Sequence, residues 1–162
     1  MITNIEVGNL SLSKEEFDVV EMIHDVFELF EIKAHEKGIS LVFDKMYNGP
    51  VIVKADKEKI RQVITNLIVN SIKYGQKNGT TEISIEQLNK EKVVVRVTDN
   101  GEGIEKKHLS RLFERFYRVN KSGSRDEGGS GLGLSIVKHI IEAHDQKIYV
   151  ESEYGLGSEF SF

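Results

Sequence analysis

Hydrophobic residues along this chain recur at two spacings, one typical of helices and one typical of strands. Apolar side chains at helical spacing follow Ser13, at Phe17, Val20, Ile23, Phe27 and Phe30. Residues 13–16 have the S-x-x-E form of a capping box, which predicts that a first helix begins there. Gly38 suits the left-handed residue that follows many helices, so this helix should end near it.

The same spacing predicts two further helices. Asp56 can cap a helix whose inward positions are Ile60, Val63, Ile64, Leu67 and Ser71. A last helix is predicted from about Leu132 to Ala143.

Short apolar or alternating runs between these helices predict strands at 39–43, 51–53, 80–88, 92–98, 147–151 and 159–162. Helices on one face of a mixed sheet form an α/β (α+β) two-layer sandwich, which is the fold class we expect. Residues 1–12 have no clear place in this pattern, and residues 13–162 read as one domain.

Composition narrows the class of protein without naming an activity. The 162 residues, of which 39% are hydrophobic and 30% charged, match one globular domain. The chain has no cysteine, which excludes disulfides and thiolate metal sites. The net charge of −4 provides no basic field, which argues against a nucleic-acid partner. No apolar run approaches the roughly 20 residues that cross a bilayer, and no signal peptide is visible.

Polar residues line one side of the second predicted helix. At about 100° per residue, Asn66, Asn70 and Lys73 fall on one stripe, and Tyr74 borders it. Asparagine is a poor helix former, so two in mid-helix need a reason. A solvated polar edge explains this helix as well as a ligand site does.

Two glycine-containing segments could also serve a ligand. Asp99 follows a valine-rich strand and precedes Gly101 and Gly103. Its carboxylate could accept a hydrogen bond from a ligand's amino group, and the glycines would let the ligand's ring lie close to the backbone. Taken alone, this segment is better explained by an ordinary turn. The run 128–134 opens the last helix, where free N–H groups favour anions, but it has neither the Walker nor the dinucleotide form.

These three segments, in this order, resemble the ATP-binding motifs shared by histidine kinases, type II topoisomerases, large heat-shock chaperones and mismatch-repair ATPases. The run 112–118, Leu-Phe-Glu-Arg-Phe-Tyr-Arg, resembles the phenylalanine-bearing motif of sensor histidine kinases. Residues 148–152 and 155–160 resemble the last strands of the same family. The resemblance implies the Bergerat-type fold, a mixed five-stranded sheet with three helices on one face.

The resemblance also implies a role for each motif residue, with ATP and Mg²⁺ as ligands. Asn70 would bind Mg²⁺, Asn66 and Lys73 would lie at the phosphates, and Tyr74 at the base or ribose. Asp99 would read the adenine amino group, with Gly101 and Gly103 lining the base pocket. The remaining nucleotide contacts would come from Tyr117, Arg118, Gly129, Gly131, Leu132, Gly133 and Leu134. Asn66, Lys73 and Arg118 would be the catalytic group, with Arg118 at the γ-phosphate and residues 121–130 as a lid.

Two positions depart from the family pattern. The helix ending usually written His-Gly-Gly is here His144-Asp145-Gln146, which puts the geometry of that turn in doubt. Gly75 stands where a hydroxyl residue is commoner, which should matter little.

The five histidines do not include the phosphate acceptor that the family carries in a His-Glu-x-x-Thr-Pro type motif. The only proline is Pro50, and Tyr47, Asn48 and Gly49 precede it. We therefore expect a fragment whose residues 1–12 are the stub of a linker from missing dimerisation helices, with 13–162 as the catalytic domain.

The resemblance implies partners and a location for the longer protein. The partners are the dimerisation domain of the same kinase and a response regulator. The fragment would be monomeric and the full-length kinase a homodimer. The fragment would make no membrane contact. The domain would be cytoplasmic in a membrane-anchored parent. A serine kinase of the anti-sigma-factor type and a non-catalytic ATP-binding module remain as alternatives.

Overall fold

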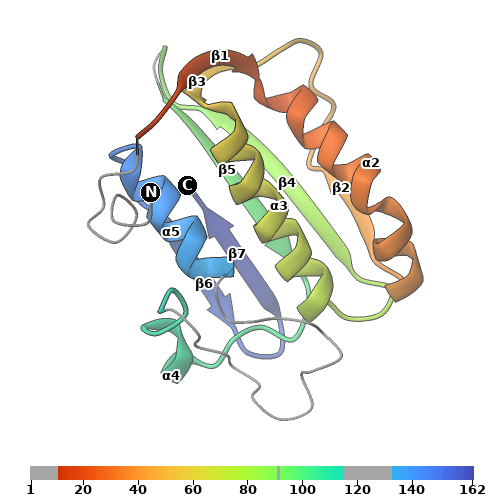
Figure 1. Ribbon diagram of the computed structural model, residues 1–162. Helices are drawn as coiled ribbons and strands as arrows, with labels where there is room; N and C mark the ends of the chain where they lie inside the picture. The colour runs from red at the N-terminus through yellow and green to blue at the C-terminus, as the bar shows by residue number, and fades with distance from the viewer. Residues whose placement is uncertain (1–10, 91, 115–132) are drawn as a thin grey trace.

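The computed structural model describes residues 11–90, 92–114 and 133–162, which form two layers (Figure 1). One layer is a sheet of five strands, in the spatial order β2 (Ser40–Phe43), β4 (Thr80–Gln87), β5 (Val93–Asp99), β7 (Gly157–Ser161) and β6 (Tyr149–Glu153). Strands β2 and β4 are parallel, and the other neighbouring pairs are antiparallel. The sheet is therefore mixed, as the sequence predicts.

Three long helices form the second layer. They are α2 (Val19–Lys37), α3 (Lys57–Tyr74) and α5 (Gly133–Ala143), and all three lie across the same face of the sheet (Figure 1). The short helix α4 (Lys106–Leu109) follows β5. The predicted sandwich of three helices on a five-stranded sheet is confirmed. No helix in the described part of the chain is long and apolar enough to cross a membrane.

The predicted start of the first helix is wrong. Residues 14–18 form strand β1 (Lys14–Asp18), which pairs antiparallel with β3 (Ile52–Asp56) in a separate two-stranded sheet. Helix α2 begins only at Val19, and its N-cap is Asp18, whose Oδ1 accepts from the N–H of Val20 at 3.0 Å. Pairing with β3 satisfies the backbone of these residues, so a tertiary contact overrides the local capping pattern.

The helix ends follow local chemistry more closely. Gly38 follows α2 with φ of 76°, the left-handed conformation expected of it. The turn after α5, in doubt because both family glycines are absent, is built around Asp145 with φ of 60°. Aspartate is one of the few residues with a side chain that tolerate this region. The turn therefore keeps a left-handed residue without a glycine.

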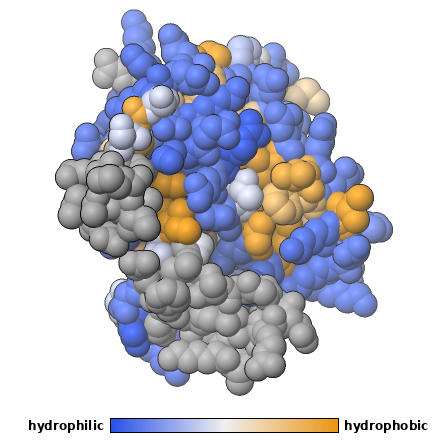
Figure 2. Space-filling view, in the orientation of Figure 1, coloured by the Kyte–Doolittle hydropathy of each residue, from blue (hydrophilic) through white to orange (hydrophobic). Residues whose placement is uncertain are grey.

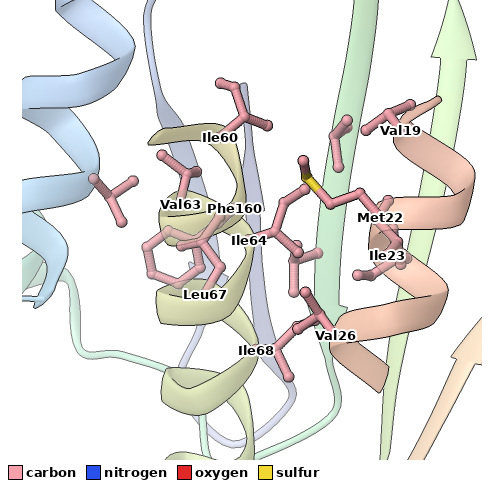
Figure 3. Close-up of a cluster of buried hydrophobic side chains, with 14 of the residues drawn as sticks. Val19, Met22, Ile23, Val26, Ile60, Val63, Ile64, Leu67, Ile68 and Phe160 are labelled. Atoms are coloured by element: carbon pink, nitrogen blue, oxygen red, sulfur yellow. The ribbon is translucent and has the colours of Figure 1, made fainter. Parts of the chain in front are cut away.

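The core lies between the sheet and the three helices. Figure 3 shows Ile64 of α3 pointing toward Met22 and Ile23 of α2, whereas Leu67 lies beside the ring of Phe160 on β7. The exposed fractions of Ile23, Ile64 and Phe160 are 0%, 0% and 2%. This packing sets the rotation of α3, and therefore decides which of its side chains face away from the core.

Asp56 joins three segments at one end of the helical layer. Its Oδ1 caps α3 by accepting from the N–H of Lys59 at 3.2 Å, and its Oδ2 accepts from the N–H of Ser13 at 2.9 Å. Its own N–H donates to Nε2 of His144, which follows α5, at 3.1 Å. Burial alone would raise the pKa of Asp56, but the two N–H groups, with smaller electrostatic effects of Lys59 and His144, hold the pKa below its usual value.

We expect Asp56→Asn to lower the free energy of unfolding by about 1 kcal/mol at pH 7, since the amide keeps one acceptor and loses the other. Because the pKa of Asp56 is lower in the folded state, its stabilisation is present above the unfolded-state pKa of about 3.9 and is lost as the pH falls through the folded-state pKa. Urea unfolding between about pH 7 and pH 3 should therefore show the difference between the two proteins shrinking in acid. A difference that stays constant with pH would contradict this role.

Candidate nucleotide site

Helix α3 presents its polar stripe away from the core. Asn66, Asn70 and Lys73 are half-buried, while the opposite side of the helix carries buried Ile64 and Ile68. The Nδ2 of Asn66 donates to the carbonyl of Gly133, the first residue of α5, at 3.4 Å. The structure thus brings the α3 stripe to the start of α5, as a shared phosphate site requires.

The end of α3 is held by its neighbours. Lys37 of α2 donates from its Nζ to the carbonyl of Lys73. The Nζ of Lys73 lies 5.2 Å from the ring centroid of Tyr74, within the range of a cation–π contact. The last turn of the helix therefore presents a cation and an aromatic ring together, next to the loop after β5.

Asp99 ends β5 in a partly desolvated position. Its Oδ1 accepts from the N–H of Gly101 at 2.9 Å. Burial raises the pKa of Asp99, and the nearby backbone N–H groups of Gly101 and Ser158 only partly offset that effect. A desolvated carboxylate gains from a further donor, such as the amino group of a ligand.

Two glycines let the loop after β5 pack closely against its surroundings. A Cβ at Gly101 would lie 2.5 Å from the carbonyl oxygen of Tyr74. Gly103 has φ of +76°, and a Cβ there would lie 2.2 Å from the carbonyl oxygen of Glu153. Only glycine fits both positions, so the loop lies between the end of α3 and strand β6. Asp99 and Tyr74 are brought together by this packing.

A row of hydroxyl groups beside Asp99 was not predicted from the sequence. Thr81, Asp99 and Ser158 are direct neighbours across β4, β5 and β7, and Ser152 faces Ser158 on β6. The Oγ atoms of Ser152 and Ser158 are 2.8 Å apart, and Ser71 of α3 bonds to Thr81. Strand alternation places Ser152 and Ser158 on the same inward face as Val150 and Phe160, where apolar side chains are expected. Polar residues at these inward positions were the signal available in the sequence.

Several predicted site residues lie outside the described part of the chain. They are Tyr117, Arg118, Gly129, Gly131 and Leu132. Gly133 and Leu134 are described: Gly133 is exposed at the start of α5, and Leu134 is half-buried against the core. The roles of all seven residues stay predictions.

The opposite face of the sheet is unsuited to a triphosphate. A shallow hollow of about 430 Å³ over β5, β7 and β6 is lined in part by Thr98, Glu151 and Glu159, which are cross-strand neighbours on the face without helices. Asp99, Ser152 and Ser158 are also among its lining residues. Its glutamates would repel phosphate groups. The hydropathy of the helical face is shown in Figure 2, where hydrophilic residues dominate and hydrophobic ones emerge over α2.

Comparison with known proteins agrees with this geometry. Residues 55–162 match the family described as histidine kinase-, DNA gyrase B- and HSP90-like ATPase. The chain belongs to this family.

Within the family, the similar proteins include sensor histidine kinases. The autoinducer 2 sensor kinase/phosphatase LuxQ of Vibrio cholerae is 31% identical over 98% of this chain and 19% of its own length. The sensor histidine kinase WalK of Bacillus subtilis is 32% identical over 99% of this chain and 26% of its own. The chain therefore spans about a fifth to a quarter of these relatives.

Solved structures extend the similarity to the catalytic domain itself. The nucleotide-free catalytic domain of the histidine kinase ThkA superposes with a TM-score of 0.78 at 33% identity, over 93% of this chain and 96% of that one. Full-length ShkA in complex with AMPPNP gives a TM-score of 0.81 at 28% identity, over 99% of this chain and 34% of that one. The chain is a catalytic ATP-binding domain of the histidine kinase type.

Proposed function

We propose that this domain binds Mg-ATP and transfers the γ-phosphoryl group to a histidine on a dimerisation domain, from which a response-regulator aspartate receives it. The observation that supports this most directly is the convergence of three segments that are far apart in the sequence. Asn66 of α3 bonds to Gly133 at the start of α5, and Gly101 packs against Tyr74 at the end of α3. One elongated site along α3 thus offers amides at one end and Asp99 at the other.

The described residues fit the two ligands. Asn70 offers a side-chain oxygen on the exposed stripe of α3, the hard ligand type that Mg²⁺ prefers. When bound, Mg²⁺ would neutralise charge on the phosphates. Lys73 would add a positive charge, and Asp99 would accept a hydrogen bond from the adenine amino group. Asn66 cannot accept a proton as a carboxylate base would, which suits a kinase that must not hydrolyse its ATP.

The remaining assignments follow from the family resemblance. Arg118 would stabilise charge on the γ-phosphate during transfer, and Tyr117 would complete the nucleotide contacts. Residues 121–130 would form a lid, and Gly129, Gly131, Leu132, Gly133 and Leu134 would lie along the phosphates. Residues 1–12 would lead from the dimerisation helices to the catalytic domain at 13–162.

The partners of the longer protein are part of the proposal. ThkA, whose structure in complex with the response regulator TrrA gives a TM-score of 0.76 at 30% identity, supports a response regulator as partner. We further propose that the full-length kinase is a homodimer anchored in a membrane, with this domain in the cytoplasm. The chain alone would be a monomer that binds ATP without an acceptor histidine of its own.

The phosphate acceptor decides between this proposal and its alternatives. The domain should be incubated with γ-labelled ATP, Mg²⁺ and a separately made dimerisation domain from the same gene. We expect acid-labile, base-stable label on a histidine of that domain, and none when EDTA removes the Mg²⁺. Label on serine would favour the anti-sigma type of kinase. ATP binding without any transfer would favour the non-catalytic module.

A further inference from the structure

Ser152 on β6 has three hydrogen-bond partners, and together they determine the direction of every bond. The N–H of Ile104 donates to its Oγ at 2.7 Å, and its hydroxyl donates to the carbonyl of Gly157 at 2.9 Å. The Oγ of Ser158 lies 2.8 Å away. A hydroxyl has one hydrogen, and a carbonyl can only accept, so the Ser152 hydrogen goes to Gly157. All three hydrogen bonds can form together only when Ser158 donates to Ser152.

This direction leaves Ser158 with lone pairs and no hydrogen for a ligand. Ser158 is the direct neighbour of Asp99 across β5 and β7, and its side chain is 7% exposed. The ionised carboxylate of Asp99 also has no hydrogen to donate and can only accept. The two groups therefore form an edge of acceptors at the end of the site where the base would lie.

Ser152 also holds the glycine loop in place. Its bond to the N–H of Ile104 fixes the backbone directly after Gly103. The carbonyl of Glu102 accepts from the N–H of Gly155 at 2.6 Å, so the loop is attached at two points, once to β6 and once to the β6–β7 turn. Loss of the Ser152 hydroxyl would remove its attachment to Ile104, and the Ser158 hydroxyl could then donate its hydrogen to another group.

We propose that Ser152 is a positioning residue for base recognition. Because Ser158 donates its hydrogen to Ser152, the Ser158 hydroxyl can only accept from a ligand. The site therefore binds purines with a 6-amino group more tightly than those with a 6-oxo group. This inference rests on the proposed nucleotide site. A 6-amino group donates to the acceptor edge, whereas a 6-oxo group would face two acceptors and leave them unpaired.

The test compares ATP with ITP, which differs from ATP at the 6-position and N1 of the base. Dissociation constants should be measured by calorimetry for the wild-type domain, Ser152→Ala, Ser152→Thr and Ser84→Ala. In Ser152→Ala, the Ser158 hydroxyl can turn and donate, so the preference for ATP over ITP should fall by roughly five- to tenfold. Ser152→Thr keeps the hydroxyl and should keep the preference. Ser84→Ala removes a strand hydroxyl from the other face of the sheet and should change nothing.

Hydrogen exchange separates this inference from the proposed function. Without nucleotide, the amide of Ile104 should exchange at least about tenfold faster in Ser152→Ala than in the wild type. An unchanged ATP preference in Ser152→Ala, or unchanged exchange at Ile104, would overturn the proposal. A wild-type domain that binds neither nucleotide would refute the proposed function instead, and the exchange result would then decide the role of Ser152.

A further variant covers the case in which Ser152→Ala does not fold. Ser158→Ala removes the acceptor itself and leaves Ser152 able to bond to Ile104 and Gly157. We expect it to bind ATP more weakly while the Ile104 amide exchanges as in the wild type. Unchanged ATP affinity in this variant would also overturn the proposal.

Discussion

Replacing Asp99 by Asn should weaken ATP binding by about 1–3 kcal/mol, or roughly 5- to 150-fold in the dissociation constant. The carboxylate accepts from the N–H of Gly101 and keeps capacity for a ligand donor. An amide has only one accepting oxygen. Its NH₂ group would face either a backbone N–H or the adenine amino group, and two donors that face each other leave both unpaired.

The matched control for this prediction is Glu102→Gln. It makes the same chemical change three residues further along, at an exposed side chain of the same loop. Calorimetric titration with ATP should find the control close to the wild type and Asp99→Asn clearly weaker. Equal affinities for all three proteins would remove Asp99 from the base site.

The pH dependence of ATP binding should also show the contribution of Asp99. Because burial raises the pKa of Asp99, protonation in the free domain begins at a higher pH than for an ordinary aspartate, whose pKa is about 3.9. Affinity for ATP should fall as the pH drops through this raised value, since the protonated group donates where an acceptor is needed. Asp99→Asn should lack this component of the pH profile.

Replacing Ile64 by Ala should lower the free energy of unfolding by about 2–5 kcal/mol. Ile64 is 0% exposed and lies between α3 and α2 in the centre of the core (Figure 3). The truncation removes buried apolar atoms and leaves a cavity that the two helices and the sheet cannot close completely. Urea unfolding monitored by circular dichroism would measure the loss.

Ile32→Ala is the matched control, because it makes the same change in a helix at a side chain that is 76% exposed. Its effect should stay within about 0.5 kcal/mol. Similar losses in both variants would show that Ile64 does not occupy the tightly packed position that the structure gives it.

Local sequence pattern was a reliable guide wherever short-range chemistry decides the conformation. The cap at Asp56, the end of α2 at Gly38 and the strand that ends at Asp99 were predicted from neighbouring residues. The start of α2 was not, because Ser13 and Glu16 satisfy a local rule that pairing of β1 with β3 overrides. That pairing joins residues about 40 positions apart, which no short window can contain.

The sequence by itself determined the mixed sheet with its three helices, the family, and the polar residues of α3 and Asp99 as candidate ligand groups. These properties depend on periodicity and on motifs whose residues are close together in the chain. Only the tertiary structure decided that Asn66 meets Gly133, and that Ser152 and Ser158 lie beside Asp99. The physical reason is that strand order and helix rotation follow from packing of the whole core, which brings together polar groups that no local pattern connects.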